Sequence, residues 1–322
     1  MGRGTLAWLI LTFLRVLESN AVEIKPSTNP AVAGDTLTLS LSPSLTFKSG
    51  SWAVGEIQIL TWLGEQQAVF SNHTGRASVN VLTGALTLSS VKVTDSGVYI
   101  VQSTDPPLKA NTSITVLEAV SNVTLKATQT SLTEFNSSVI MTCTVSSGSS
   151  LSFVWMNSSS EVNASERVQL TDGGSTLTIT NVTRYDRGPF ECHASNSVSN
   201  GSSDSVSLTI TYGPDNMALT VNGLNTTSFP AGSNLTMLCS AQSNPPAELR
   251  WAFQGQPVNT SGPLWELMSV TKDHSGLYSC LASNNHTNLN STITKNILIA
   301  GSSEHVVNAW LLLLFLLSRL LY

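Results

Sequence analysis

The chain has 322 residues, of which 41% are hydrophobic and 11% are charged, and its formal net charge at pH 7 is −5. This length is too great for one small core and is sufficient for two or three domains. With few lysines and arginines, the sequence lacks the basic stripe that binds nucleic acid.

The N-terminus has the features of a secretory signal peptide. Arg3 supplies the positive charge, and residues 5–14 are mostly apolar but too few to span a bilayer. Ser19 and Ala21 are small residues two positions apart, as signal peptidase requires. We therefore predict that residues 1–21 are removed and that the mature chain is extracellular, where cysteines form disulfides.

A motif in the first third of the chain, DSGVYIV at residues 95–101, follows an alternating apolar run at residues 86–91. Such alternation predicts a strand with one buried face. The same arrangement occurs twice more and ends in DRGPFEC at Cys192 and in HSGLYSC at Cys280. The chain therefore contains three copies of one unit.

The second and third copies each contain a cysteine, a tryptophan twelve residues later and a second cysteine. These residues are Cys143, Trp155 and Cys192, and Cys239, Trp251 and Cys280. Immunoglobulin domains have this spacing, with the tryptophan packed on a disulfide that joins two sheets. We therefore predict the disulfides Cys143–Cys192 and Cys239–Cys280. The spacing does not provide the close cysteine pairs of a zinc site.

The first copy has apolar residues where both cysteines are expected. Alignment with the other copies puts Leu41 and Val101 at these positions. Trp62 is predicted to be the core tryptophan, which makes the segment between Ser42 and this residue longer than usual. Tyr99 is expected to keep the hydrogen bond of the tyrosine corner.

In two copies an arginine precedes an aspartate by 19 residues. The pairs are Arg76–Asp95 and Arg167–Asp186. Immunoglobulin domains often join such residues at the base of the sandwich. In the third copy His274 stands at the aspartate position and no arginine lies 19 residues upstream, so we predict that the pair is absent there.

The repeats predict an all-β fold of tandem immunoglobulin-like β-sandwiches. Residues 22–117 are assigned to a V-like domain that lacks the inter-sheet disulfide. Residues 118–211 and 212–299 are assigned to two C2-type domains that each contain one. The sequence YGPDN at residues 212–216 marks the junction between them.

The C-terminus, residues 300–322, has the features of a GPI-attachment signal. Small residues, with Gly301 and Ser302 as the predicted attachment site, precede a short polar spacer and an apolar tail. The tail has fewer than the ~20 apolar residues that span a bilayer, and we predict that it is removed. The alternative is a short C-terminal helix that remains in the membrane.

Acceptor sequences for N-glycosylation occur throughout the predicted extracellular part. They lie at Asn72, Asn111, Asn122, Asn136, Asn157, Asn163, Asn181, Asn200, Asn225, Asn234, Asn259, Asn285 and Asn290. Thirteen such sequences behind a signal peptide predict a glycoprotein of the cell surface. Only two lie in the first domain, so this domain is the one least shielded from protein partners.

With these features the chain resembles the carcinoembryonic-antigen-related cell adhesion molecules over its whole length. The shared features are the signal peptide, a V-like first domain without the disulfide, disulfide-bonded C2-type domains, many acceptor asparagines and a GPI-type tail. The most specific of these is the absence of the disulfide in the first domain, since the later domains alone fit many proteins.

The resemblance implies an adhesion molecule on the extracellular face of the plasma membrane. In this family the first domain binds the same protein, or related immunoglobulin-superfamily proteins on apposed cells, through the sheet of strands C, C′, F and G. The matching positions in this chain are Thr61, Leu63, Val69, Gln102 and Thr104. Leu63 departs from the aromatic residue that often follows the core tryptophan in the family.

The sequence contains no recognisable catalytic or cofactor-binding motif. Its five histidines lack the spacing of metal ligands or of a catalytic triad, and we expect them to be ordinary surface or loop residues. They are His73, His193, His274, His286 and His305. We therefore expect no enzymatic activity, no cofactor and no small-molecule substrate.

Adhesion has two alternatives at this stage. The chain would be a GPI-anchored ligand-binding immune receptor or decoy that does not bind itself, or a mucin-like surface coat with no specific partner. Binding between ectodomains of the same chain distinguishes adhesion from both, because neither alternative predicts it.

Overall fold

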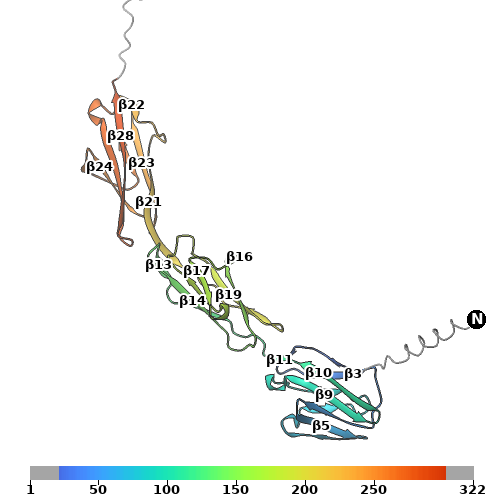
Figure 1. The fold of residues 1–322 in the computed structure, drawn as a ribbon. Helices are drawn as coiled ribbons and strands as arrows, with labels where there is room; N and C mark the ends of the chain where they lie inside the picture. The colour runs from blue at the N-terminus through green and yellow to red at the C-terminus, as the bar shows by residue number, and fades with distance from the viewer. Residues whose placement is uncertain (1–21, 302–322) are drawn as a thin grey trace, which may run out of the picture. The chain divides into compact units, whose positions relative to one another are not determined.

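The computed structural model describes residues 22–301, which form an all-β fold (Figure 1). The predictions for residues 1–21, for Ser302 and for the C-terminal tail lie outside the described residues. Contacts divide the described chain into a first unit of residues 22–128, 140–178 and 189–206, and a second unit of residues 129–139, 179–188 and 207–301. The division passes through the predicted second domain, whose boundaries stay a prediction.

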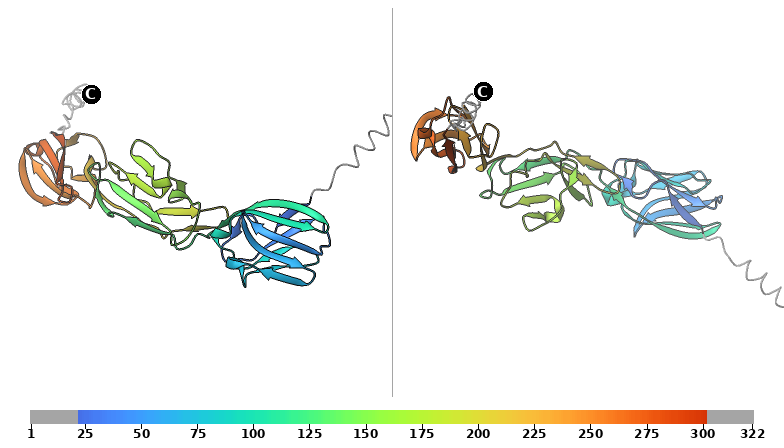
Figure 2. Two further views of the ribbon diagram at one scale, coloured as in Figure 1. Left: turned by 60° about the horizontal axis from the view of Figure 1, so that its bottom comes forward. Right: turned by 90° about the horizontal axis from the view of Figure 1, so that it is seen from above.

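In the first unit, residues 22–117 form two antiparallel sheets, here called the first sandwich (Figure 2). One sheet has the order β1-β3-β8-β7, with strands Glu23–Pro26, Leu37–Ser42, Leu86–Leu88 and Ala77–Val79. The other has the order β10-β9-β4-β5-β6, with strands Pro107–Ile114, Gly97–Thr104, Ser49–Val54, Ile57–Leu63 and Gln66–Val69. The parallel pair β2 (Ala31–Val32) and β11 (Val116–Leu117) and the 3₁₀ turns η1 (Ser71–His73) and η2 (Val93–Asp95) complete it.

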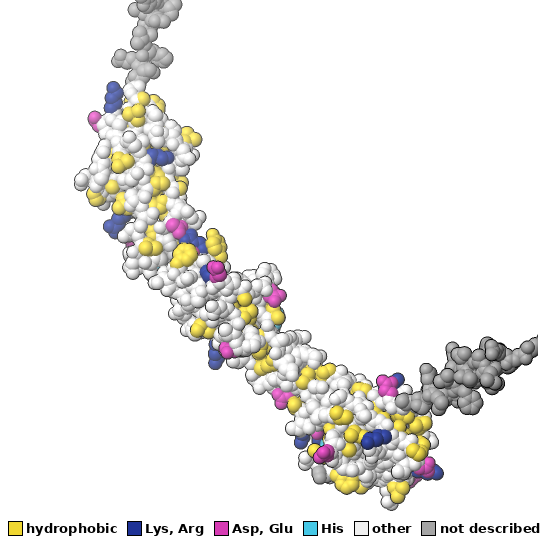
Figure 3. Space-filling view, in the orientation of Figure 1, with side chains coloured by type: hydrophobic (Ala, Val, Ile, Leu, Met, Phe, Trp, Pro, Cys, Tyr) yellow, Lys and Arg dark blue, Asp and Glu magenta, His cyan; other side chains and the backbone are white. Residues whose placement is uncertain are grey.

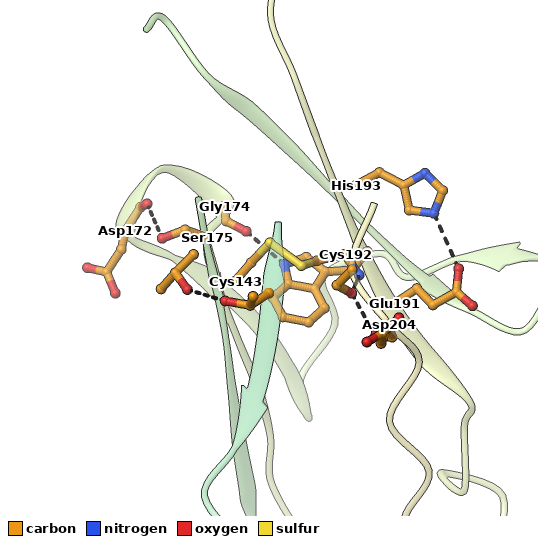
Figure 4. Close-up of a disulfide and its surroundings, with 12 residues drawn as sticks. Cys143, Asp172, Gly174, Ser175, Glu191, Cys192, His193 and Asp204 are labelled. Atoms are coloured by element: carbon orange, nitrogen blue, oxygen red, sulfur yellow. Dashed lines mark hydrogen bonds and ion pairs between the residues drawn. A yellow bond between two sulfur atoms is a disulfide. The ribbon is translucent and has the colours of Figure 1, made fainter. Parts of the chain in front are cut away.

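Two further sheets lie mostly in the first unit and are joined by the disulfide Cys143–Cys192. One has the order β12-β14-β18-β17, with strands Thr124–Ala127, Val139–Thr144, Thr176–Ile179 and Val168–Thr171. The other has the order β16-β15-β19-β20, with strands Ser160–Glu161, Ser152–Asn157, Phe190–Ser195 and Asn200–Ser202, and η3 spans Asp172–Gly174. Figure 4 shows this predicted disulfide beside Gly174.

The second unit contains two further sheets, joined by the disulfide Cys239–Cys280. One has the order β13-β21-β23-β26, with strands Ser131–Thr133, Thr209–Val221, Leu235–Asn244 and Leu264–Leu267. The other has the order β22-β28-β27-β24-β25, with strands Ser228–Pro230, Leu289–Ala300, Gly276–Asn284, Glu248–Phe253 and Gln256–Ser261, and η4 spans Lys272–His274. Both predicted disulfides are therefore present.

Strand register identifies the core tryptophan of each repeat. The cross-strand pairs are Trp52–Val101, Trp155–Cys192 and Trp251–Cys280. The indole N–H groups of the three tryptophans donate hydrogen bonds to the carbonyl oxygens of Gly84, Gly174 and Gly262, at 2.8, 2.7 and 3.0 Å. The three repeats thus share one buried arrangement, and in the first sandwich its tryptophan is Trp52.

The prediction that Trp62 is this core tryptophan is wrong. Trp62 is also buried, at 3% exposed, but it lies on β5 and pairs with Gly50 of β4. The segment before it contains a complete strand, β4, and is not an unusually long connection. Trp52 follows Leu41 by eleven residues, close to the spacing of twelve in the other repeats.

The two predicted replacements of cysteine are confirmed by register. Leu41 pairs with Ile24, as Cys143 pairs with Leu125 in the corresponding strands. Val101 pairs with Trp52, as described above. Leu41 and Val101 are both buried in the same hydrophobic cluster, so apolar packing between the sheets takes the place of a covalent bond.

We predict that the double variant Leu41→Cys/Val101→Cys forms a disulfide and raises the melting temperature. The Cα atoms of the bonded cysteines in the two other repeats are 6.1 and 6.4 Å apart, and register puts residues 41 and 101 at the same positions. Closing a loop of this length stabilises a domain by about 4 kcal/mol in the chain-entropy model, less the packing lost on removing two apolar side chains. Thiol titration and calorimetry with and without reductant measure both effects, and persistent free thiols would contradict the prediction.

The predicted pair Arg76–Asp95 is confirmed at the base of the first sandwich. The Arg76 guanidinium donates two hydrogen bonds to the Asp95 carboxylate, at 2.8 and 3.1 Å. The Lys92 N–H also donates to this carboxylate, at 2.8 Å. Burial alone would raise the pKa of Asp95, but the hydrogen bonds from Arg76 and Lys92 lower it below its ordinary value. The Tyr99 hydroxyl donates to the Asp95 carbonyl oxygen at 2.8 Å, which confirms the tyrosine corner.

The contacts at the base of the sandwich differ in the other two repeats. In the second repeat the Asp186 carboxylate accepts a hydrogen bond from the Thr183 N–H at 2.7 Å, while its pairing with Arg167 stays a prediction. In the third, His274 Nδ1 accepts from the Thr271 N–H at 2.9 Å. A histidine thus caps the same turn that a carboxylate caps in the other two.

His73 lies in the turn η1 but is buried, so it is not the ordinary exposed residue that the sequence led us to expect. Its side chain is 4% exposed, and its Nε2 lies 3.7 Å from an Asp95 carboxylate oxygen. Neither ring nitrogen forms a hydrogen bond within the described part of the chain. Burial lowers the pKa of the His73 imidazole below its ordinary value, although the nearby Asp95 carboxylate raises it in part.

We predict that the first sandwich loses stability as the pH falls from about 7 to 5 and that His73→Gln removes part of this loss. Because the folded-state pKa of His73 is lowered, the unfolded chain binds more protons below the ordinary histidine pKa of about 6.5. The lowered pKa of Asp95 contributes only in more acidic solution. Unfolding free energies at both pH values measure the difference, with exposed His193→Gln as control. An unchanged pH dependence in His73→Gln would contradict this.

A charged cluster in the second unit was not predicted. The Arg184 guanidinium donates hydrogen bonds to the carboxylates of Glu134 and Asp215, and it lies 4.0 Å from the centre of the Tyr212 ring. These hydrogen bonds raise the pKa of Arg184, and the bond from Arg184 lowers that of Glu134. The cluster joins three separate stretches of sequence beside the long strand β21.

Candidate binding face of the first sandwich

The candidate site is the solvent-exposed surface of the sheet β10-β9-β4-β5-β6, here called the outer face. Side chains alternate along β9, so Tyr99 and Val101 are buried in the core while Gln102 and Thr104 are exposed. The predicted residues Gln102 and Thr104 therefore lie on the outer face.

Register places the predicted residues of β5 on the same surface. Gln102 pairs with Ser51 of β4, and Ser51 pairs with Thr61 of β5. The pairs continue to Lys109 of β10 on one side and to Ala68 of β6 on the other. This row of five residues crosses the whole sheet and is called the central row.

Leu63 is the most prominent apolar residue of the outer face. It pairs with Ser49 on β4 and with Gln66 on β6, and its side chain is 73% exposed. An exposed leucine beside amide and hydroxyl groups provides both apolar contact and hydrogen-bonding capacity, as protein interfaces require. Four of the five predicted residues thus lie on one surface.

The strand assignment of the predicted residues needs two corrections. Thr61 and Leu63 lie on β5, the strand that follows the one with the core tryptophan, and not on the tryptophan's own strand β4. Val69 pairs with the buried Leu60 and packs partly against the core, because its side chain points to the other side of the sheet. Val69 is therefore not a residue of the outer face.

β4 lies at the centre of the outer face and was not predicted from the sequence. Ser49, Ser51 and Ala53 contribute its outward positions. The spacing from Leu41 to Trp52 is the signal that would have identified this strand. It also changes the residue that follows the core tryptophan from Leu63 to Ala53.

A shallow hollow of about 390 Å³ lies at one end of the outer face. Gly50 and Trp62 contribute to its lining, together with Gln102 and Thr104. A Cβ atom at residue 50 would lie 2.4 Å from the Trp62 ring, so only glycine fits between the two strands here. The Trp62 indole N–H forms no hydrogen bond to any residue of the described range.

The outer face carries little charge. Lys109 is the only charged residue of the central row, and Lys48 and Asp105 form an exposed ion pair of 3.0 Å beyond the ends of β4 and β9. Charged side chains are also few and scattered on the side of the molecule drawn in Figure 3. A partner at this face would therefore be recognised by shape, apolar contact and neutral hydrogen bonds.

The acceptor asparagines lie at the surface, and Asn157 alone among them is half-buried. In the first sandwich, Asn72 lies in η1, after the end of β6, whereas Asn111 lies on β10 within the outer face. Among residues 22–301 there is no grouping of three or more histidine, cysteine or acidic side chains that would hold a metal ion. The same range contains no helix with the length and hydrophobicity of a membrane span.

Comparison with known proteins agrees with this architecture. A family model described as "Immunoglobulin domain" matches residues 122–196 and 219–284. The rat (Rattus norvegicus) cell adhesion molecule CEACAM16 is 26% identical over 318 residues, which cover 94% of this chain and 72% of the relative.

Two solved structures are similar to the fold. The crystal structure of murine CEACAM1b is 25% identical, covers 59% of this chain and 99% of its own, and has a TM-score of 0.51. The full ectodomain of mouse nectin-like molecule 4, Ig1–Ig3, covers 87% of this chain and 100% of its own with a TM-score of 0.53, and at 16% identity it supports the fold alone. The chain therefore contains immunoglobulin-like domains and is similar over most of its length to a cell adhesion molecule of the CEACAM type.

Proposed function

We propose that the chain is a cell-surface adhesion molecule that binds through the outer face of its first sandwich. The observation that carries the proposal is an exposed, nearly uncharged sheet surface on the part of the chain with the fewest acceptor asparagines. The similarity to proteins named as cell adhesion molecules supports the same class of function. The partner is the same protein or a related immunoglobulin-superfamily protein.

The charge of the outer face suits a contact between two copies. Only Lys109 in the central row is charged, so two facing copies place few like charges against each other. Leu63 is 73% exposed, so burial of its side chain contributes the largest hydrophobic free energy to such a contact. Binding to itself is therefore the first mode to test.

We predict that Leu63→Asp reduces clustering of beads coated with residues 22–301 by about tenfold or more. A buried, unpaired carboxylate costs more than the ~1.4 kcal/mol that corresponds to a tenfold change in affinity. Because Leu63 is exposed, the substitution leaves the core intact. Ser40→Asp is the matched control, since Ser40 is exposed on the opposite sheet.

Three results are informative. Clustering that is lost in Leu63→Asp and retained in Ser40→Asp supports the proposed face. Clustering that persists in both variants contradicts it. If wild-type beads do not cluster but bind saturably to other cells, the chain is a receptor or decoy without self-adhesion.

We also propose that the mature chain is attached to the membrane by a GPI anchor. Gly301 is exposed and directly follows β28, the last strand of the described residues, so the proposed attachment site is accessible. The predicted signal peptide, the acceptor asparagines and the C-terminal signal support a glycoprotein on the extracellular face of the plasma membrane.

Phosphatidylinositol-specific phospholipase C is predicted to release the full chain from the surface of expressing cells, because a GPI-linked protein has no membrane-spanning helix. Flow cytometry before and after treatment measures the loss. A fusion of residues 22–301 to a known transmembrane helix is the control that must stay on the cells. Retention of the wild-type chain would favour the alternative of a short C-terminal helix.

A further inference from the structure

Asn111 occupies a position inside the outer face. It lies on β10, the edge strand of the sheet, and pairs with Ile100 of β9, which in turn pairs with Ala53 of β4. The Asn111 side chain is exposed and forms no hydrogen bond within residues 22–301. Its acceptor sequence is completed by Ser113, which is exposed on the same side of the strand.

A glycan on Asn111 would lie close to one half of the central row. Gln102 is the diagonal cross-strand neighbour of Asn111, and such neighbours lie about 7–8 Å apart. Lys109 is two residues along the same strand and on the same side. A bulky, hydrated glycan at this point prevents a protein partner from desolvating either side chain.

The other half of the face lies farther from Asn111. Thr61 and Leu63 are on β5, three strand spacings away from β10, which corresponds to about 14 Å across the sheet. Gln66 and Ala68 on β6 lie one strand farther. Leu63 is also displaced from Asn111 along the strand direction, because it belongs to the row beyond the central row.

We propose that an N-glycan on Asn111 covers the β9–β10 half of the outer face, so that the partner binds to the half formed by β5 and β6. The proposal rests on the proposed adhesive function and adds a regulatory step to it. Chains that carry the glycan bind through Leu63 and its neighbours, and chains that lack it bind through the wider surface that includes Gln102.

Three variants separate the glycan from the side chain that carries it. Ser113→Ala removes the acceptor sequence but keeps Asn111, Asn111→Gln removes both, and Ser113→Thr keeps the sequence. Intact-mass spectrometry before and after peptide-N-glycosidase treatment measures occupancy in each. An unmodified Asn111 in the wild-type chain made by mammalian cells would overturn the proposal.

Shielding of the outer face by the glycan is measured by the reactivity of an introduced thiol, which does not require adhesion. All four native cysteines are in disulfides, so an introduced cysteine is the only free thiol. Lys109→Cys is expected to react several-fold more slowly with a polyethylene-glycol maleimide in the Ser113→Thr background than in the Ser113→Ala background. Gln66→Cys, on the open half, is expected to react equally in both. Equal rates for Lys109→Cys in both backgrounds would overturn the proposal.

The bead assay then tests the effect on binding. Ser113→Ala and Asn111→Gln are expected to cluster several-fold more strongly than wild type, and Gln102→Asp is expected to weaken clustering only in these two backgrounds. Weaker clustering of both variants would mean that the glycan forms part of the contact and would overturn the proposal. Absence of clustering in every variant, with Lys109→Cys still shielded, would contradict the adhesive function and not the shielding.

Discussion

A buried tryptophan that packs between two sheets is the contact on which each repeat depends. Its indole N–H is paired with a glycine carbonyl on the opposite side of the core, so the ring is held by packing and by a hydrogen bond together. Removing a buried aromatic side chain of this size costs about 3–5 kcal/mol. In two repeats a disulfide supports the ring, and in the first sandwich Leu41 and Val101 must do so by packing alone.

The outer face depends on this core arrangement. β4, the strand that contains Trp52, lies at the centre of the sheet between β9 and β5, so Gln102 and Thr61 lie on opposite sides of Ser51. The close contact between Gly50 and Trp62 keeps the two neighbouring strands in register. The binding surface is thus assembled from strands that are separated in sequence and positioned by the same few buried rings.

Much of this fold was predictable because the chain contains three copies of one unit, which can be aligned with one another. Leu41 and Val101 were found by aligning one repeat with two others that keep their cysteines, and Arg76–Asp95 by a spacing that occurs twice. Trp62 follows the apolar run IQIL, which favours it as the core tryptophan from sequence, whereas Trp52 ten residues earlier follows no such run. The serines and glycine of β4 gave no alternating apolar signal.

Other features depend on contacts that no local pattern reveals. The side chain of Val69 points to the core side of the sheet, whereas those of Thr61 and Leu63 point outward. This difference follows from the pairing of Val69 with the buried Leu60. The Arg184 cluster forms between stretches that are distant in sequence, so its partners Glu134 and Asp215 could not be identified from spacing. The burial of His73 likewise depends on a turn that folds against the core.

The short parallel strand pairs have a mechanical consequence. β2 pairs with β11, β13 with β21 and β22 with β28, in each case a strand from near the start of a repeat with one from near its end. Tension along the chain would draw the two members of each pair past each other along their length, so their hydrogen bonds are loaded together in shear and not opened one after another. A molecule that holds two cells together experiences this kind of load, and the pairs lie where the load enters and leaves each repeat.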